Sequence, residues 1–366
     1  MSSTETLGFS PSPPDWFTSP AYTAQTTYTH QVNRLANYLS VVTSFLGVCA
    51  LLTGRAGLLV PCASIAIVAR KMTQVALGYL CYPAALQSLS SQYREELELT
   101  RETTIGLLEA QGFIINKITF KTTAANYSGL LISSTETINN GRWVIHAFGN
   151  CGAWEDFAFS YGARNSAIGC NTLVINGPSV GLSGGWPSRH QLGAGFEAGL
   201  QFLEEKVQAS HIIMEGLSLG GGMMGEAITQ HNFDKGLEKG TQYLSITDRS
   251  FNYLSSAAAC LSFSLAKYVF VLAGMELDGV KAAKKLSRLQ IKQIVINNKH
   301  SDTVIRDGAI LANTLQEIRP TLDHMIFLKS KKIEHNLMLP IKIQTQLDQH
   351  IQEFLALSAD SRLEAV

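Results

Sequence analysis

The pentapeptide Gly216-Leu217-Ser218-Leu219-Gly220 is the feature of this chain that most constrains its fold. It directly follows the apolar run His211 to Glu215, which predicts a buried strand, and directly precedes a helical segment that starts near Gly221. A serine at such a sharp strand-to-helix turn has a strained backbone and crowds the residues two positions before and after it. Glycine at both positions relieves this crowding. The pattern therefore predicts a turn that exposes the Ser218 hydroxyl above a sheet.

Seven further apolar runs indicate that this strand belongs to a larger sheet. Two of them, Ile114 to Lys121 and Tyr127 to Ser134, are separated by a polar turn and predict an antiparallel pair. Helical segments separate most of the others, whose nearly continuous hydrophobicity is typical of parallel strands covered on both faces. These are Trp143 to Phe148, Asn171 to Asn176, Tyr243 to Thr247, Gln293 to Asn297 and His324 to Leu328. The sequence therefore predicts an α/β fold with a mostly parallel eight-stranded sheet and helices on both faces.

Charged side chains make up only 16% of the chain, and they are scarce above all in residues 35–93. Leu35 to Gly54 carries no charge, and Arg55, Arg70 and Lys71 are the only charged residues from there to Tyr93. Two interpretations of this apolar helical region stay open: helices that cap the rest of the protein, or a membrane-inserted hairpin.

Residues 1–34 are rich in Ser, Thr and Pro and contain no Lys or Arg before Arg34. We therefore expect a flexible leader there and no secretory signal peptide. The predicted organisation is this leader, the apolar helical region at 35–93 and an α/β domain at 94–366.

The charge balance and the cysteines argue against several classes of protein. Lys plus Arg and Asp plus Glu number 29 each, so no basic excess exists to neutralise nucleic acid. The six cysteines form no CxxC motif and no Cys/His cluster, so we expect reduced thiols and no metal site. A phosphate-binding loop does not fit the glycines around Ser218, because neither G-x-x-x-x-G-K-[ST] nor a G-x-G-x-x-G after a strand is present.

A nucleophilic serine needs a base to take its proton and an acid to orient that base. Asp302 follows the predicted strand Gln293 to Asn297, and His335 follows the predicted strand His324 to Leu328. Because parallel strands end at the same sheet edge, we expect both side chains where Ser218 emerges. The alternative acids are Asp248 and Asp307, and the weaker candidates for the base are His300 and His324.

An ester-cleaving serine also needs two backbone donors for the oxyanion. The loop Gly149-Asn150-Cys151-Gly152 follows the strand Trp143 to Phe148, and its small residues allow close approach to a substrate. We expect the N–H groups of Asn150 and Leu219 to be these donors. We interpret Cys151 as a small residue of the loop rather than a nucleophile.

The interval between Thr247 and Gln293 predicts a helical lid at about residues 249–290. Ser250 to Ala266 is free of charge there, and Tyr268 to Leu272 follows as an apolar run. Such a lid would shape a pocket for an acyl chain or contact lipid, and two helices of ordinary core are the alternative. The residues expected at the substrate pocket or lid are Cys151, Trp186 and Phe270.

From about Ile114 to the C-terminus, these motifs resemble the α/β-hydrolase superfamily. More narrowly, Arg142 to Glu155 and Gly216 to Gly221, downstream of the apolar N-terminal third, are similar to the CHLPS/SidB group of bacterial proteins. The resemblance implies a lipase or esterase of a host-associated bacterium. It also implies an effector that is in the bacterial cytoplasm before its delivery into a host cell, and the uncharged segments of the chain add an expected association with a membrane. Many superfamily members have His-Gly at the oxyanion loop, where this chain has Phe148-Gly149.

We therefore predict a serine hydrolase that cleaves an acyl ester through Ser218, His335 and Asp302 and a covalent acyl-enzyme, without metal or organic cofactor. The expected partners are a lipid or acyl-ester substrate and a membrane surface. Two alternatives stay open. One is an acyltransferase with the same triad, and the other is a membrane-associated binding or scaffold protein in which Ser218 is idle.

Overall fold

The computed structural model describes residues 13–24, 59–298, 302, 304–318, 324–331, 333–335 and 338–363, with the backbone alone at 59–64 and 357–363. The uncharged stretch Leu35 to Gly54 and the candidate base His300 lie outside the described residues.

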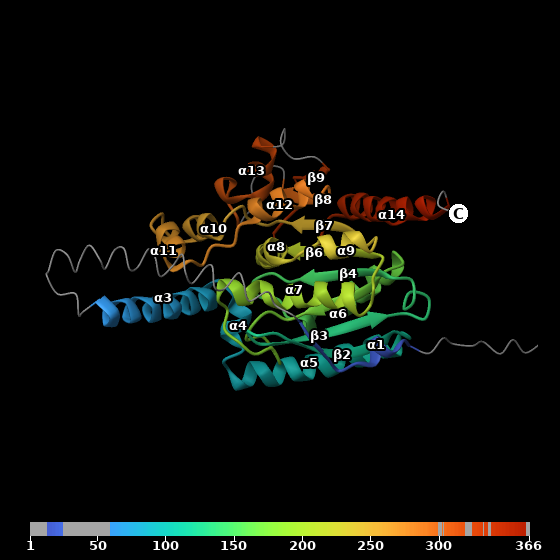
Figure 1. Cartoon of the computed structure of the whole chain (residues 1–366), viewed down its shortest axis with the longest axis horizontal. Coiled ribbons are helices and arrows are strands. Elements are labelled where there is room, and N and C mark those ends of the chain that lie inside the picture. The colour runs from blue at the N-terminus through green and yellow to red at the C-terminus, as the bar shows by residue number, and fades with distance from the viewer. Residues whose placement is uncertain are drawn as a thin grey trace, which may run out of the picture.

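A nine-stranded sheet forms the centre of the molecule (Figure 1). Its strands are β1 (Ala21–Thr23), β2 (Ile114–Lys121), β3 (Asn126–Ser133), β4 (Arg142–Ala147), β5 (Asn171–Ile175), β6 (His211–Leu217), β7 (Gln242–Asp248), β8 (Lys292–Asn298) and β9 (Met325–Ser330). Their order is β1-β2-β3-β5-β4-β6-β7-β8-β9. As predicted, β2 and β3 are antiparallel; β3 is also antiparallel to β5, and the neighbours from β5 to β9 are parallel. All eight predicted strands are present.

The ninth strand, β1, lies in the segment predicted to be a flexible leader, so that prediction is wrong for residues 13–24. β1 pairs in parallel with β2, and the short helix α1 (Asp15–Thr18) precedes it. The physical reason is aromatic packing, which offsets the entropy cost of ordering the segment. Trp16 contacts Trp143, Tyr22 contacts Phe202, and both Phe17 and Tyr22 are buried.

Helices cover both faces of the sheet (Figure 1). On one face lie α7 (Arg189–Glu205), α8 (Leu219–Gln230) and α12 (Gly279–Arg288), and on the other lie α5 (Ser91–Ala110), α6 (Trp154–Ala167) and α14 (Ile341–Leu363). The side chains of β4 alternate between these layers, as a strand requires. Trp143 and Ile145 belong to the core beneath α7 and α8, whereas Val144 packs in the core beneath α14. Two short helices, α9 (Asp234–Glu238) and α13 (Leu311–Glu317), complete these layers.

Four helices gather at the end of the molecule where the parallel strands finish (Figure 1). They are α3 (Leu59–Cys81), α4 (Pro83–Gln87), α10 (Leu254–Leu261) and α11 (Ala266–Ala273). Tyr82 and Phe270 share one hydrophobic cluster with Leu219, at the start of α8. The predicted lid at 249–290 thus contains α10 and α11, while its third helix, α12, packs against α8 within the helical layer. Among the described residues, none of the helices combines the length and hydrophobicity needed to cross a membrane.

Candidate active site

Ser218 lies at the sharp turn between β6 and α8. Its φ of 53° and ψ of −118° are unusual for a residue with a side chain and mark a strained backbone. Its N–H donates to the carbonyl oxygen of Asp248 at 2.8 Å, and its own carbonyl accepts from the Ser250 hydroxyl at 2.8 Å. The turn is therefore fixed to the end of the neighbouring strand β7, and Ser218 stands at the carboxyl edge of the sheet.

The two glycines of the motif are required because backbones approach closely on both sides of Ser218. A Cβ atom at Gly220 would lie 2.1 Å from the carbonyl oxygen of Ala147 at the end of β4. A Cβ atom at Gly216 would lie 2.7 Å from the Cα atom of Gly221. Neither position has room for a methyl group, so the pattern reflects the tight packing of the first turn of α8.

Ser218, His335 and Asp302 form one chain of hydrogen bonds, although they come from three separate loops. Nε2 of His335 lies 2.9 Å from Oγ of Ser218, and Nδ1 of His335 lies 2.8 Å from Oδ2 of Asp302. Asp302 and His335 are buried, and Ser218 is half-buried. This arrangement allows the imidazole to accept the serine proton while the carboxylate stabilises the imidazolium.

Asp302 is held as a carboxylate by its hydrogen-bond donors. Burial alone would raise its pKa, but the hydrogen bond from His335 and those from the backbone of Ile305 and Val304 bring the pKa below its usual value. The two backbone N–H groups donate to Oδ1 at 2.9 and 2.8 Å, which leaves Oδ2 for His335.

The loop that carries His335 is anchored through its backbone by two side chains that were not predicted from the sequence. Arg249 Nη1 donates to the carbonyl oxygen of Glu334 at 2.5 Å, and Asn298 Nδ2 donates to that of Ile333 at 2.6 Å. A backbone carbonyl oxygen can accept a hydrogen bond whatever side chain its residue carries. Such an anchor is therefore not predicted by any pattern of residue types. The signal that was available is the pair Asp248-Arg249, two opposite charges directly after a buried strand.

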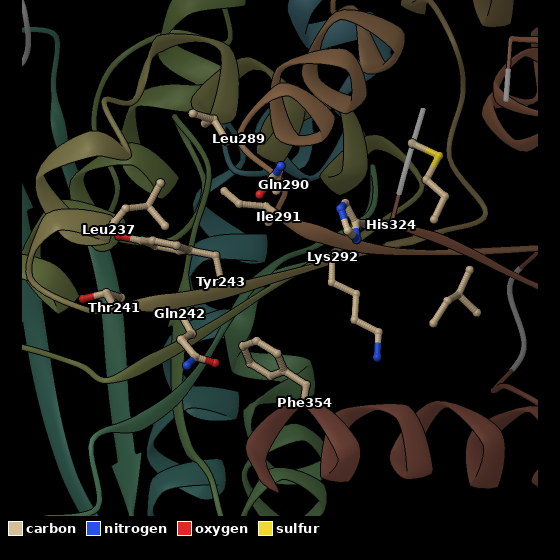
Figure 2. A pocket seen from close by; sticks show the side chains of 12 residues that line it. Leu237, Thr241, Gln242, Tyr243, Leu289, Gln290, Ile291, Lys292, His324 and Phe354 are labelled. Atoms are coloured by element: carbon tan, nitrogen blue, oxygen red, sulfur yellow. The ribbon is translucent and has the colours of Figure 1, made fainter. Parts of the chain in front are cut away.

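The side chains of the alternative acids and of the described alternative base, His324, take no part in this chain of hydrogen bonds. Asp248 is bound by Arg249, with N–O distances of 2.9 and 2.7 Å, and Asp307 is exposed in a short 3₁₀ helix. His324 precedes β9 at the opposite edge of the sheet. There it lines a hollow of about 490 Å³ together with residues such as Tyr243 and Phe354 (Figure 2). Since Ser218 stands at the carboxyl edge, this hollow does not adjoin Ser218.

The loop after β4 lies beside Ser218. A Cβ atom at Gly149 would be 3.7 Å from the Cβ atom of Ser218, and the carbonyl of Asn150 accepts a hydrogen bond of 3.1 Å from the N–H of Ala84 in α4. Leu219 is the first residue of α8, where backbone N–H groups have no partner within the helix. The use of the Asn150 and Leu219 N–H groups as oxyanion donors stays a prediction.

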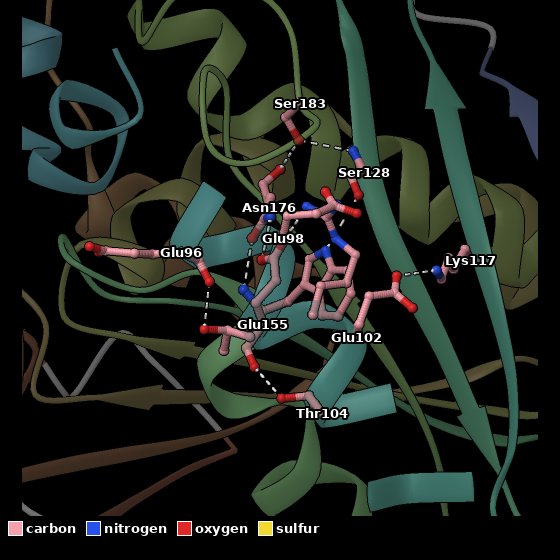
Figure 3. Close-up of polar contacts among 12 residues, drawn as sticks. Glu96, Glu98, Glu102, Thr104, Lys117, Ser128, Glu155, Asn176 and Ser183 are labelled. Atoms are coloured by element: carbon pink, nitrogen blue, oxygen red, sulfur yellow. Dashed lines mark hydrogen bonds and ion pairs between the residues drawn. The ribbon is translucent and has the colours of Figure 1, made fainter. Parts of the chain in front are cut away.

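A buried polar network holds the start of α6, directly after this loop (Figure 3). Asn176 Oδ1 accepts from the N–H of Trp154 at 2.8 Å. Glu155 is fully buried and accepts from Asn176 Nδ2 and from Arg101 Nη2, both at 2.8 Å, and Thr104 donates to its carbonyl. Burial raises the pKa of Glu155, although Asn176 and Arg101 stabilise its ionised form. Through Arg101, the network ties α5 to the loop beside Ser218.

The three residues expected at the substrate pocket or lid lie in different environments. Cys151 is exposed next to Asn150, and Trp186 is 61% exposed in the loop between β5 and α7. Phe270 is buried in α11, in the cluster that contains Leu219. Their contact with a substrate stays a prediction.

Solved structures with this architecture include an alpha-beta hydrolase from Vibrio vulnificus. It is 15% identical in sequence, with a TM-score of 0.55, and the match covers 72% of this chain and 94% of that one. The esterase Pf2001 from Pyrococcus furiosus is also 15% identical, with a TM-score of 0.49 and coverages of 68% and 94%. The likeness to the Vibrio structure shows the fold, so the chain has the α/β-hydrolase fold.

Comparison at the level of sequence families points to one group. None of the curated proteins matches the chain. Residues 114–356, from the first residue of β2 into α14, match the family model described as Chlamydia CHLPS protein (DUF818). This match covers more than half of the chain, and the protein therefore belongs to the Chlamydia CHLPS family.

Proposed function

We propose that this protein is a serine hydrolase that cleaves an acyl ester through a covalent acyl-enzyme. The observation that carries the proposal is the position of His335, whose two ring nitrogens lie within hydrogen-bond distance of Ser218 Oγ and Asp302 Oδ2. An idle serine would need neither the strained turn nor this partner. The α/β-hydrolase fold supports the same conclusion, because it commonly supports this chemistry at the carboxyl edge of its sheet.

In the first half of the reaction, Ser218 Oγ attacks the ester carbonyl while Nε2 of His335 takes the hydroxyl proton. Asp302 holds the imidazole by accepting from Nδ1, and it stabilises the positive charge that develops. The N–H groups of Asn150 and Leu219 stabilise the oxyanion. When the intermediate collapses, the carbon–oxygen bond to the leaving group breaks and His335 returns the proton to that group.

In the second half, water replaces the leaving group. His335 takes a proton from the water, whose oxygen attacks the acyl carbonyl, and the bond to Ser218 Oγ breaks. The proton returns to Oγ, and the carboxylic acid is released. Water is the only co-reactant, so the steps balance for a carboxylic ester, and also for a thioester, in which a carbon–sulfur bond breaks in place of the carbon–oxygen bond.

An ester with an apolar acyl chain is the substrate class that best fits the residues around Ser218. Leu219, directly after the nucleophile, packs in one cluster with Met223, Tyr82 and Phe251, and the lid residue Phe270 belongs to the same cluster. Apolar side chains favour an apolar chain over a charged one at this position.

Labelling with a fluorophosphonate probe tests the assignment. We expect the wild-type protein to be labelled and Ser218→Ala to be inert. Ser210→Ala is the matched control, because Ser210 also contacts a histidine, Nδ1 of His211 at 2.9 Å, but at the other end of β6. Hydrolysis of p-nitrophenyl esters of increasing chain length then reports the acyl preference. Labelling that survives in Ser218→Ala, or a folded wild-type protein without labelling, would contradict the proposal.

A further inference from the structure

Helices α10 and α11 expose a continuous series of large apolar side chains. In α11, Ala266, Phe270 and Ala273 are buried at the i, i+4, i+7 spacing of a single helix face. The opposite face of α11 and the turn before this helix are apolar as well. A helix that only caps a core needs just one apolar face. Between 50% and 76% of each side chain is exposed for Leu261, Phe263, Leu265, Tyr268, Val271 and Leu272, which together we call the lid surface.

Helix α3 extends this surface. It packs against α11, where Arg70 Nε and Gln74 Nε2 donate to the carbonyl oxygen of Ala273 at 2.9 and 2.6 Å. Its exposed residues Ile65, Val68 and Met72 follow the i, i+3, i+7 spacing of one helix face. Figure 1 shows α3, α10 and α11 together at the end of the molecule where the parallel strands finish.

Helices α3, α4, α10 and α11 contain no acidic residue, and the acidic residue nearest to them in sequence, Glu276, accepts a hydrogen bond from the Ser255 N–H in α10. From residue 59 to 90 and from residue 250 to 275 the sequence contains no Asp or Glu, and its charged residues there are Arg70, Lys71 and Lys267. Lys267 is exposed within the lid surface. Helix α5, in contrast, carries five glutamates among its 20 residues. Helices α10, α11 and α3 thus combine exposed apolar residues with basic but no acidic side chains, whereas the exposed leucines of α5 lie among glutamates.

We propose that the lid surface and the exposed face of α3 bind an anionic lipid membrane. Soluble monomers rarely leave so many neighbouring apolar side chains in water, and an apolar helix face with basic but no acidic residues is typical of helices at the membrane interface. The absence of acidic residues from these three helices favours anionic lipid headgroups over a protein partner, whose surface would carry both signs of charge.

The location of this surface gives it a consequence for the reaction, which rests on the proposed hydrolase function. Phe270 on the inner face of α11 shares a hydrophobic cluster with Leu219, so the membrane-facing helices pack directly against the start of the nucleophile helix. A protein bound in this way holds its site next to acyl esters that are insoluble in water. The substrate class would then be a membrane lipid ester.

Vesicle flotation of the full-length protein tests the binding. The Ser218→Ala background is used so that binding is measured without turnover. The probes are vesicles of phosphatidylcholine alone and of phosphatidylcholine with phosphatidylserine in equal parts. We expect binding to the anionic vesicles, and a loss of roughly tenfold or more in Leu265→Glu/Leu272→Glu. The matched control is Leu99→Glu/Leu107→Glu, which changes two exposed leucines of α5, 71% and 51% exposed.

The four substituted leucines are exposed, and thermal unfolding checks that each variant keeps its fold. The proposal is overturned if the protein does not float with anionic vesicles, or if the lid variant floats as well as the control. It is also overturned if light scattering finds a dimer that the lid variant converts to a monomer, because the surface is then a subunit interface. In the active background, fluorophosphonate labelling of the lid variant at the wild-type rate separates lost membrane binding from failure of the catalytic assignment.

Discussion

Arg249 donates a hydrogen bond to the carbonyl oxygen of Glu334, the residue directly before His335. The same guanidinium forms an ion pair with Asp248 at the end of β7, and Arg249 is buried. The position of the imidazole therefore depends on a side chain that follows a neighbouring strand and does not itself touch Ser218 or Asp302 in any described contact. Arg249 is a positioning residue for the proposed base.

Replacing Arg249 should consequently affect turnover more than substrate binding. In Arg249→Lys the charge stays next to Asp248, but the shorter, single-headed ammonium does not reach both partners. Since a small misplacement of a catalytic group can cost roughly 100-fold in rate, we expect kcat to fall by about that factor while KM stays nearly constant. Steady-state kinetics on a p-nitrophenyl ester measures both constants.

Asp248→Asn is the control for this prediction. It removes the charge that pairs with Arg249 but leaves the hydrogen bond to Glu334 in place, so kcat should fall much less. Equal losses in both variants would assign the effect to the ion pair and general stability. An Arg249→Lys variant with wild-type kcat would remove Arg249 from the list of positioning residues.

The lowered pKa of Asp302 predicts the acid limb of the pH profile. A carboxyl group whose pKa in the folded protein lies below its usual value of 3.8 stays ionised at all higher pH. Its contribution to stability is then complete above 3.8 and is lost as the pH falls through the folded value. Above pH 3.8, Asp302 therefore adds no ionisation of its own to the acid limb of the pH profile. We expect log kcat/KM to rise with the slope of a single ionisation, measured with an uncharged ester substrate, and a slope of two would contradict this.

The contacts in Figure 3 include a buried and an exposed ion pair, and we predict that breaking them has very different effects on stability. Glu155→Gln leaves the buried Arg101 without its buried carboxylate partner, and we expect a loss of about 3 kcal/mol in the free energy of unfolding. Because α6 follows the loop beside Ser218, kcat should fall too. Lys117→Gln, which breaks the exposed pair with Glu102, should change neither stability nor kcat measurably. Urea unfolding provides the measurement, and equal effects of the two variants would contradict the role of the buried network.

The strands were predictable from the sequence to within two residues at each end, because each is a short apolar run bounded by polar turns. β1 was not, because three residues in a Pro-rich segment show no periodicity. The strand is stabilised by contacts with residues far along the chain, such as Tyr22 with Phe202. Local patterns do not contain such contacts.

The candidate site also has one part that the local sequence predicts and another that depends on contacts between distant residues. Ser218 has a local signature, since the glycines and flanking elements all lie within one strand-turn-helix unit. Asp302 and Asp248 both follow late strands and were equivalent as types of residue. What separates them is the neighbouring Arg249, which engages Asp248, and the loop geometry that directs Asp302 to His335. Such a choice depends on distances between loops, and the order of residues alone does not determine these.

The glycines around Ser218 provide a last prediction, because they differ in the space that surrounds them. At Gly220 a Cβ atom would lie 2.1 Å from the carbonyl oxygen of Ala147, and the end of a central strand has no room to move away. We expect Gly220→Ala to lower the free energy of unfolding by about 3 kcal/mol. At Gly225, in the same helix, the nearest atom would be the Cβ of Ala282 at 3.4 Å, an ordinary contact. Gly225→Ala should therefore stabilise the helix by up to about 1 kcal/mol, since alanine is the better helix former. Urea unfolding of the two variants beside the wild-type protein measures both changes. Equal stabilities would mean that the start of α8 can shift away from β4, and the turn at Ser218 would then not be fixed as described.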